Sequence, residues 1–294
     1  MKRFIKCKNE EGLEVLFDST FNPFLLEDCD GIYSVANNVS VSENTMTDGG
    51  TYQGSVTSVR NIVLTLRDEA NADHEANRTL IYKLFKPKAK GTFIYFEHKG
   101  AESRSIDYYV ENIDIDGKMR SRRYTISLIC TDPFFVGEND LKVAIAGWIS
   151  SFKFPFEIPQ EGLVFGSKIE EKLKTIDNSS AAENIGLTIT IKAGGNVKNP
   201  TIYHVEKKEQ ITVGTEENPL NLLNGDSVII TTGTNDKHTY LIRDGVKTEI
   251  NTYLSEVSEF IQLQHGLNTI GYSAEVGEEH MEVEVSYRYR YLGA

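Results

Sequence analysis

The sequence has few cysteines, few prolines and no long apolar run. Its 294 residues include 3 Cys, 7 Pro and 1 Trp. The cysteines, Cys7, Cys29 and Cys130, are odd in number, lie far apart and show no C-x-x-C spacing, so neither a disulfide framework nor a zinc ribbon fits them. We therefore expect free thiols in a protein made in a reducing compartment.

The sequence also lacks the apolar segments of a membrane span and of a secretory signal. No stretch approaches the roughly 18 apolar residues that a membrane span needs. The first residues, MKRFIKCKNEEGLEV, carry charge but lack the apolar core of a secretory signal. The sequence therefore predicts neither a bilayer anchor nor secretion by a Sec signal.

Basic charge is scarce as well. The chain has 43 acidic and 31 basic residues, a formal net charge of −12, which opposes attraction to phosphate backbones. An acidic surface of this kind suits a wall past which nucleic acid slides without sticking. We therefore expect no stable binding of DNA.

What the sequence does contain favours strands. Phe and Tyr occur 14 times each, beside 23 Gly. Residues 1–135 read as strands such as LEVLF (13–17) and RNIVLTL (60–66), with one amphipathic helix at about 71–86. Asn71 or Asp73 is a plausible N-cap for this helix. We predict that 1–135 is the first domain.

The second half of the chain is read as strands only. Residues 136–160 contain a proline-rich run that excludes central strands, and we expect a linker there. From 161 to 294 many short strands alternate with turn signals, the clearest being Asp244-Gly245, which predicts an antiparallel β-sandwich or jelly roll. The fold class is thus mainly β with one clear helix.

No motif for chemistry is complete. HEANR (74–78) starts like a zinc-protease helix but has Arg78 where the second histidine should stand. NIDIDG (112–117) opens like a calcium loop, but the position of the closing glutamate is Arg123. GGTYQG (49–54) lacks the lysine of a phosphate loop and reads better as a hairpin tip. We expect no enzyme, no metal site and no cofactor.

The final stretch, MEVEVSYRYRYLGA (281–294), alternates tyrosine and arginine. A ladder for stacking nucleobases would expose the tyrosines. Here they continue the face of Met281, Val283 and Val285, which indicates a strand with one buried face. We predict that it closes the C-terminal sandwich, with a return to the first domain as the alternative.

An ordered set of segments resembles a known family. The first half contains RNIVLTL, RTLIYKLFKPKAKGTFIYF, RSIDYYVENIDI and RRYTISLICTDPFF. The second contains FPFEIPQEGLVFG, GLTITIKAGGNVKNPTIYH, LLNGDSVIITT, FIQLQHGLNTIGYS and YRYRYLGA. Together they resemble the distal tail protein family of long-tailed phages that infect Gram-positive bacteria. The segment 166–185 departs from the pattern, because it is charged and loop-like.

The resemblance implies a structural protein of a phage virion, a prophage or a phage-tail-like particle. Its N-terminal domain is expected to form a homo-hexameric ring around a DNA channel, and its C-terminal domain a galectin-like sandwich. The expected partners are the tail-tube protein and a tail-tip or baseplate protein. For a heterologous ring contact, the candidates facing acids such as Glu27, Asp28 and Asp30 are Lys86, Lys88, Lys90, Arg120, Arg122 and Arg123.

A carbohydrate-binding module is the alternative function. In this reading the sandwich binds a cell-wall saccharide through exposed aromatic rings, and it could coexist with the structural role. Tyrosines in strands are more often half-buried sheet residues. The candidate aromatics are Tyr203, Tyr240, Tyr253 and Tyr272.

Overall fold

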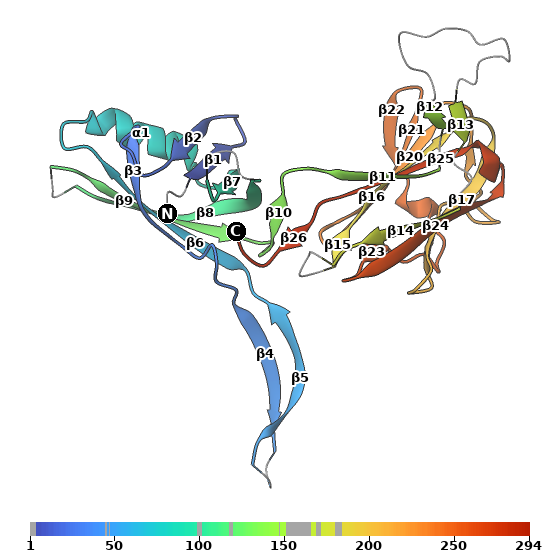
Figure 1. The fold of residues 1–294 in the computed structure, drawn as a ribbon, viewed down its shortest axis with the longest axis horizontal. Helices are drawn as coiled ribbons and strands as arrows, with labels where there is room; N and C mark the ends of the chain where they lie inside the picture. Colours follow the sequence, from blue (N-terminus) through green and yellow to red (C-terminus); the bar gives the residue numbers. More distant parts are fainter. Residues whose placement is uncertain are drawn as a thin grey trace. The chain divides into compact units, whose positions relative to one another are not determined.

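The computed structural model describes residues 4–44, 46, 48–98, 102–117, 120–146, 148–150, 166–168, 172–179 and 184–294 (Figure 1). The chain forms two compact units. Unit 1 comprises the residues up to Glu138 together with Arg290–Ala294, and unit 2 is Asn139–Tyr289. The predicted fold class, mainly β with one α-helix in the described part of the chain, is confirmed. No helix among these residues is long and apolar enough to cross a membrane.

Unit 1 is built on a nine-stranded antiparallel sheet. Its main path runs in the order β2-β1-β7-β8-β9-β6-β3, and β10 pairs with both β8 and β26. The strands are β1 (Phe4–Asn9), β2 (Glu14–Phe17), β3 (Phe24–Asp30), β6 (Arg60–Asp68), β7 (Lys90–Phe96), β8 (Arg104–Asp116), β9 (Arg123–Cys130), β10 (Phe135–Gly137) and β26 (Arg290–Tyr291).

One helix, α1 (His74–Leu84), packs its apolar side on the core of unit 1. It starts at Asp73, whose carboxylate accepts hydrogen bonds from the backbone N–H groups of Glu75 (3.1 Å) and Ala76 (3.0 Å). This N-cap is one of the two predicted, and the helix is shorter than the predicted 71–86. Of the apolar residues of this helix, Ile81 and Leu84 are buried.

The core of unit 1 is rich in aromatic side chains. Phe17, Phe24, Phe93, Tyr108 and Tyr124 are all fully buried, and burying a side chain of this size stabilises a fold by about 1.5–3 kcal/mol. The three cysteines are free thiols in the same core, as predicted. Burial raises the pKa of the Cys130 thiol to about 12, which keeps it protonated and unreactive at neutral pH.

Unit 2 is a sandwich of two antiparallel sheets. The six-stranded sheet has the order β11-β25-β16-β20-β21-β22, and the five-stranded sheet follows β14-β24-β17-β18, with β19 also on β17. The strands are β11 (Leu141–Ala146), β14 (Leu173–Asp177), β16 (Thr188–Ala193), β17 (Val197–His204), β18 (Glu209–Thr212), β19 (Asn221–Leu222), β20 (Ser227–Gly233), β21 (Asp236–Arg243), β22 (Val246–Glu249), β24 (Leu267–Val276) and β25 (Met281–Tyr287).

Short elements complete unit 2. They are the pairs β12 (Trp148–Ser150) with β13 (Gly166–Lys168) and β15 (Ile185–Gly186) with β23 (Gln262–Leu263), and the 3-10 helices η1 (Asn251–Tyr253) and η2 (Glu278–His280). The predicted two-residue turn joins β21 to β22. Asp244 and Gly245 both have positive φ, 52° and 76°, as a type I′ hairpin requires.

The core of unit 2 lies between its two sheets. Inward-facing Ile189, Ile230 and Val285 come from the six-stranded sheet, and Ile202 and Ile270 come from the five-stranded sheet. Each is fully buried, and along their strands they alternate with residues on the outer faces. This is the period-two pattern from which a sandwich was predicted.

Two segments differ from the sequence prediction. Residues 141–146, expected within a linker at 136–160, form β11 on the edge of the six-stranded sheet, because Leu141, Val143 and Ile145 face inward in alternation. The last stretch does not act as one long closing strand. β25 lies inside the sandwich, between β11 and β16, whereas Arg290–Tyr291 pairs with β10 in unit 1. Residues 151–165 of the expected linker lie outside the described residues.

Candidate interaction surface

A two-stranded hairpin in unit 1 leaves the nine-stranded sheet altogether. β4 (Asn37–Glu43) and β5 (Gly50–Thr57) pair with each other in a sheet of their own. We call Asn37–Thr57 the arm. Figure 1 shows it extending away from the sheet of unit 1. Every residue of β4 is exposed, and β5 is exposed except for half-buried Gly54 and Thr57.

One face of the arm is an apolar stripe. Val39 and Val41 lie two residues apart on β4, and Tyr52 is the cross-strand partner of Val41. Their exposed fractions are 56%, 54% and 63%. The Val41 side chain lies over Gly50, where an added Cβ would come within 2.6 Å of its Cγ1, so this close approach requires glycine. On the opposite face Val56 pairs with Asn38.

The arm is not expected to be a stable folded element by itself. An isolated two-stranded hairpin is marginally stable in water. A contiguous exposed apolar face commonly marks a protein interaction site. The sequence from 34 to 59 contains no Lys or Arg and only two acids, Glu43 and Asp48. The arm therefore has the composition of a surface that a partner covers, with a negatively charged end.

Arg60 organises the base of the arm. It is the first residue of β6, 5% exposed, and its guanidinium donates to the carbonyl oxygens of Pro133 (2.7 Å), Gly31 (2.7 Å) and Ser34 (2.6 Å). It also donates to Leu292 O and lies 5.1 Å from the centre of the Phe135 ring. We call residues 31–36 and 58–60 the arm root.

The residues Arg290–Ala294, which we call the return segment, dock beside this root. β26 pairs with β10. The Arg104 guanidinium donates a hydrogen bond to Gly293 O (2.8 Å) and stacks over the Tyr291 ring, 4.0 Å from its centre. The Ala294 N–H donates to Ile32 O (3.1 Å). Arg290 forms an ion pair with Asp132 at 2.6 Å, and its guanidinium lies 4.3 Å from the Phe134 ring centre. The arginines of the repeat thus bind within unit 1 or, for Arg288, pair with Asp140 in unit 2.

Half of the basic residues predicted to contact a neighbouring subunit have partners within the chain. Lys86 pairs with Glu11 (2.9 Å), and Lys90 pairs with Asp107 (2.7 Å). Arg123 pairs with Glu27 at 2.8 Å, although Glu27 was expected to face it from another subunit. The other three predicted residues form no ion pair in the described part of the chain: Lys88 and Arg120 are exposed, and Arg122 is half-buried.

The four predicted tyrosines do not share one surface. Tyr272 is buried in the core, and burial raises its pKa. Tyr253 lies in η1 against the same core. Tyr240 on β21 stacks with His238, with ring centroids 5.6 Å apart, and carries Lys247 Nζ 3.7 Å from its ring centre. Tyr203 lies over the backbone of its cross-strand partner Gly271, where an added Cβ would come 2.5 Å from its ring.

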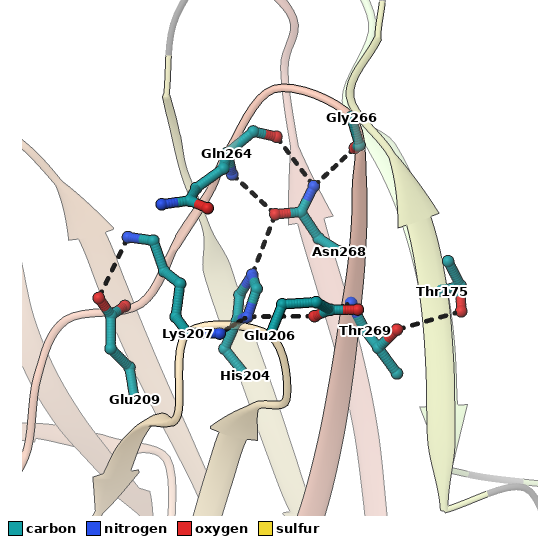
Figure 2. Close-up of polar contacts among 9 residues, drawn as sticks. All are labelled: Thr175, His204, Glu206, Lys207, Glu209, Gln264, Gly266, Asn268 and Thr269. Carbon is teal, nitrogen blue, oxygen red and sulfur yellow. Dashed lines mark hydrogen bonds and ion pairs between the residues drawn. The ribbon is translucent and has the colours of Figure 1, made fainter.

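A buried polar cluster in unit 2 fixes one turn (Figure 2). His204 Nε2 lies 3.0 Å from Asn268 Oδ1, and the backbone N–H of Lys207 donates to His204 Nδ1 (3.3 Å). The same Nδ1 also lies 3.3 Å from Glu206 Oε2. Asn268 in turn binds Gln264 and Gly266 through their backbone groups. Each group has a structural partner, and the cluster holds the 264–268 turn.

A second buried cluster anchors α1 in unit 1. The Asp68 carboxylate is fully buried and accepts hydrogen bonds from Tyr124 Oη (2.9 Å) and the Arg122 N–H (2.6 Å). His74 Nδ1 lies 2.7 Å from Asp68 Oδ2, the oxygen to which Tyr124 also donates. His74, the first residue of HEANR, is therefore held by Asp68. No group of three or more His, Cys, Asp or Glu in the described ranges could hold a metal ion.

The sequence pattern alone did not single out the arm stripe. NNVSVSE alternates valine with polar residues, which is a strand signal, but this pattern does not show whether the valines are covered or exposed. Arg60 was missed too, because a lone arginine at the start of a strand is an ordinary residue until its acceptors from distant segments are known.

Comparison with known proteins shows which family model the chain matches. Residues 180–291 match the family model of the siphovirus-type tail component, C-terminal domain. Residues 180–291 belong to this family. Among curated protein sequences, none matches the chain significantly. This part of unit 2 is therefore similar to a phage tail component, as the resemblance of its ordered segments indicated.

Solved structures extend the similarity to the whole length of the chain. The Dit protein (gp 19.1) of phage SPP1, described as a paradigm of the hub adsorption apparatus in phages infecting Gram-positive bacteria, matches with a TM-score of 0.67 at 12% identity, covering 97% of this chain and 98% of that one. The activated baseplate of phage P2 with Ca matches at 0.55 and 10% identity, covering 100% of both chains. The same baseplate with Sr matches at 0.53 and 10%, covering 99% of both. These likenesses show the fold.

Proposed function

We propose that this tail component is a distal tail protein, a structural hub that forms a hexameric ring between the tail tube and the tail tip or baseplate. The ring leaves a channel through which DNA passes. Support comes from the fold shared with the SPP1 hub protein over nearly the full chain, and from the family of residues 180–291. The single observation that carries the proposal in this chain is the arm, a marginal hairpin whose apolar stripe lacks a cover within the described residues.

The arm fits one side of a ring contact. Subunits of a ring meet through two different surfaces, so each copy needs an extension on one side and a receiving surface on the other. The arm supplies apolar area and negative charge, through Glu43 and Asp48. Lys88 and Arg120, which form no ion pair within the described residues, are candidates for the receiving side. The acidic net charge, in turn, favours passage of DNA without retention.

Removing the stripe is expected to abolish the ring. In the triple variant Val39→Ser, Val41→Ser, Tyr52→Ser, the arm loses its apolar face while its hydroxyl-rich character and strand pairing remain. Each buried aliphatic or aromatic anchor contributes on the order of 1.5–3 kcal/mol to association, so native mass spectrometry and light scattering should report monomers. Val56→Ser, on the opposite face and 68% exposed, is the matched control and should still assemble. A six-fold ring formed by the triple variant would contradict the role of the stripe.

The basic residues allow a second test of the same contact. Reversing charge with Lys88→Glu and Arg120→Glu should weaken the ring at low ionic strength and much less in high salt, because exposed charges are screened over about 8–10 Å at physiological ionic strength. Sedimentation velocity at two salt concentrations measures this difference. Arg123→Glu serves as a comparison, since Arg123 already pairs with Glu27 in its own chain. Equal assembly of the double variant and the parent chain at low salt would remove these two residues from the interface.

Saccharide binding by unit 2 is a second candidate function, and the placement of Tyr203 favours it. Its ring lies across Gly271 on the outer face of the five-stranded sheet, between the hydroxyl pairs Thr201–Thr212 and Thr175–Thr269. A ring presented in this way can stack against the apolar face of a sugar. Tyr203→Ala should remove binding of fragments of purified cell-wall polysaccharide, and Tyr203→Phe should retain it. Titration calorimetry that detects no binding by the full chain ends this candidate.

A further inference from the structure

The arm root and the return segment are joined by one side chain. The acceptors of Arg60 include Gly31 and Ser34, which lead into β4, and Leu292 of the return segment. Arg60 itself follows the arm in the chain. A single buried guanidinium therefore connects both ends of the arm to residues that come more than two hundred positions later. Among the described residues the Arg60 guanidinium has no carboxylate partner. Its charge is therefore stabilised by hydrogen bonds to these carbonyl oxygens.

The return segment also completes the core beneath the arm root. Tyr291 and Ala294 pack against the core of unit 1, and β26 covers one edge of β10, where Phe135 is fully buried. The Ala294 N–H donates to Ile32 O, and Gly293 lies in van der Waals range of the same oxygen. Without these residues Ile32 loses part of its cover, and Ile32 O keeps only the longer hydrogen bond from Arg60 Nη1 (3.4 Å).

Beyond the contacts of Arg60 and the return segment, the arm root is held by a hydrogen bond between Tyr33 Oη and Tyr95 Oη (2.6 Å) and by the Ser58 N–H, which donates to Ala36 O (2.9 Å). Its two sides, with Pro133, line a cavity of about 50 Å³. The arm beyond it pairs with itself and has no other sheet neighbour in the described structure. The orientation of the arm on unit 1 therefore depends on the root, where Arg60 and the segments that it binds supply several of the hydrogen bonds.

The order of synthesis separates these contacts in time. The chain leaves unit 1 at Glu138, forms all of unit 2 and returns at Arg290. At about 5–20 residues per second, the intervening residues take on the order of ten seconds to make. During that interval the arm strands and most of the nine-stranded sheet are already available to fold, while β26 and the acceptor Leu292 O do not yet exist.

We propose that docking of the return segment is the step that fixes the arm on unit 1, so that a chain becomes competent to bind a second copy only after its unit 2 has been made. This coupling rests on the proposed ring function. A free, incompletely fixed arm must be ordered when it binds, and that entropic cost lowers the affinity of early chains for one another. Arg60 is the positioning residue, since it acts through the arm root and not by contact with a neighbouring copy. The late docking of the return segment therefore keeps unfinished chains from binding one another.

The test compares the full chain with a variant lacking Arg290–Ala294. Hydrogen–deuterium exchange is measured for peptides covering the arm root, with β16 and β20 of unit 2 as internal controls, and assembly is followed by native mass spectrometry. We expect exchange at the arm root to rise by about tenfold or more, exchange in unit 2 to be unchanged, and the ring to be lost although the arm stripe is intact. Adding the peptide YRYRYLGA in trans should restore slow exchange and part of the assembly, whereas a scrambled peptide should not.

A milder variant keeps the test decisive if the shortened chain folds poorly. Ala294→Pro removes only the donor to Ile32 O and should raise exchange at residues 31–34. The proposal is overturned if exchange at the arm root is unchanged in both variants, or if the shortened chain assembles as well as the full chain. If the full chain itself stays monomeric, the ring function fails, and the exchange comparison alone then decides whether the return segment fixes the arm.

Discussion

Replacing Arg60 by methionine is expected to lower the free energy of unfolding of unit 1 by about 1–3 kcal/mol. Methionine fills much of the same length but donates no hydrogen bond, so the carbonyl oxygens of half-buried Gly31 and Pro133 and of exposed Ser34 lose a donor. An unsatisfied buried acceptor costs on the order of 1–3 kcal/mol, and these costs do not add fully because water reaches some of the groups. Few single changes in this chain remove so many contacts.

Chemical denaturation followed by circular dichroism measures this loss, and hydrogen exchange assigns it to unit 1. Arg78→Met is the matched control, because Arg78 is half-buried on α1 and its ion pair within the described residues is with Glu75, one turn away. Such a pair contributes about 0.2–0.5 kcal/mol. If the Arg60 variant lost no more stability than the Arg78 variant, the guanidinium would be a surface-like group and the arm root would be held by other contacts.

The strands and the helix could be predicted from the sequence because their signals are local. RNIVLTL and RRYTISLIC alternate apolar and polar residues, and the structure places them as neighbouring strands β6 and β9 with Ile62 opposite Leu128. The Asp73 cap and the Asp244-Gly245 turn depend on the residues next to them. At these places tertiary packing and local preference point to the same structure.

The return segment and the arm could not be predicted in the same way. The YRYRY repeat has the alternation of one continuous strand, but the backbone leaves the sandwich after Tyr287 and pairs again only at Arg290, in unit 1. What decides this is the presence of partners from distant segments, β10, Arg60 and Arg104, none of which is visible in the repeat itself. The arm stripe, similarly, has the alternation of an ordinary strand, and its exposure follows only from the lack of a covering layer within the described unit.

The predicted interface charges show the same limit. Basic runs in an acidic chain do indicate that the charges are paired, but a run cannot say whether the partner lies in the same chain. Lys86 and Lys90 find acids in unit 1, and Arg123 binds Glu27. Charge patterning therefore identified three residues that form ion pairs, and the fold shows that the partners of these three lie in the same chain.

The second large effect is expected at Asp68, where removal of the carboxylate with Asp68→Ala should cost about 3 kcal/mol and should flatten the acid dependence of stability. Three donors converge on this buried group: Tyr124 Oη, the Arg122 N–H and His74. Burial alone would raise the pKa of Asp68, but the hydrogen bonds from these partners outweigh it, and the net pKa is lowered. The charged form is therefore favoured in the folded state relative to the unfolded chain.

The direction of the pH effect follows from that lowered pKa. The unfolded carboxyl titrates near pH 3.9, so the stabilisation is fully present above that pH and is lost as pH falls through the lower folded value. Urea titrations at several values from pH 2.5 to 7 should show stability falling below about pH 4, with a smaller fall in Asp68→Ala. Asp73→Ala, which removes only the N-cap of α1, is the matched comparison with an expected cost of about 1 kcal/mol. Equal costs for the two variants, with the same acid dependence as the parent chain, would show that the Asp68 cluster adds nothing beyond an ordinary helix cap.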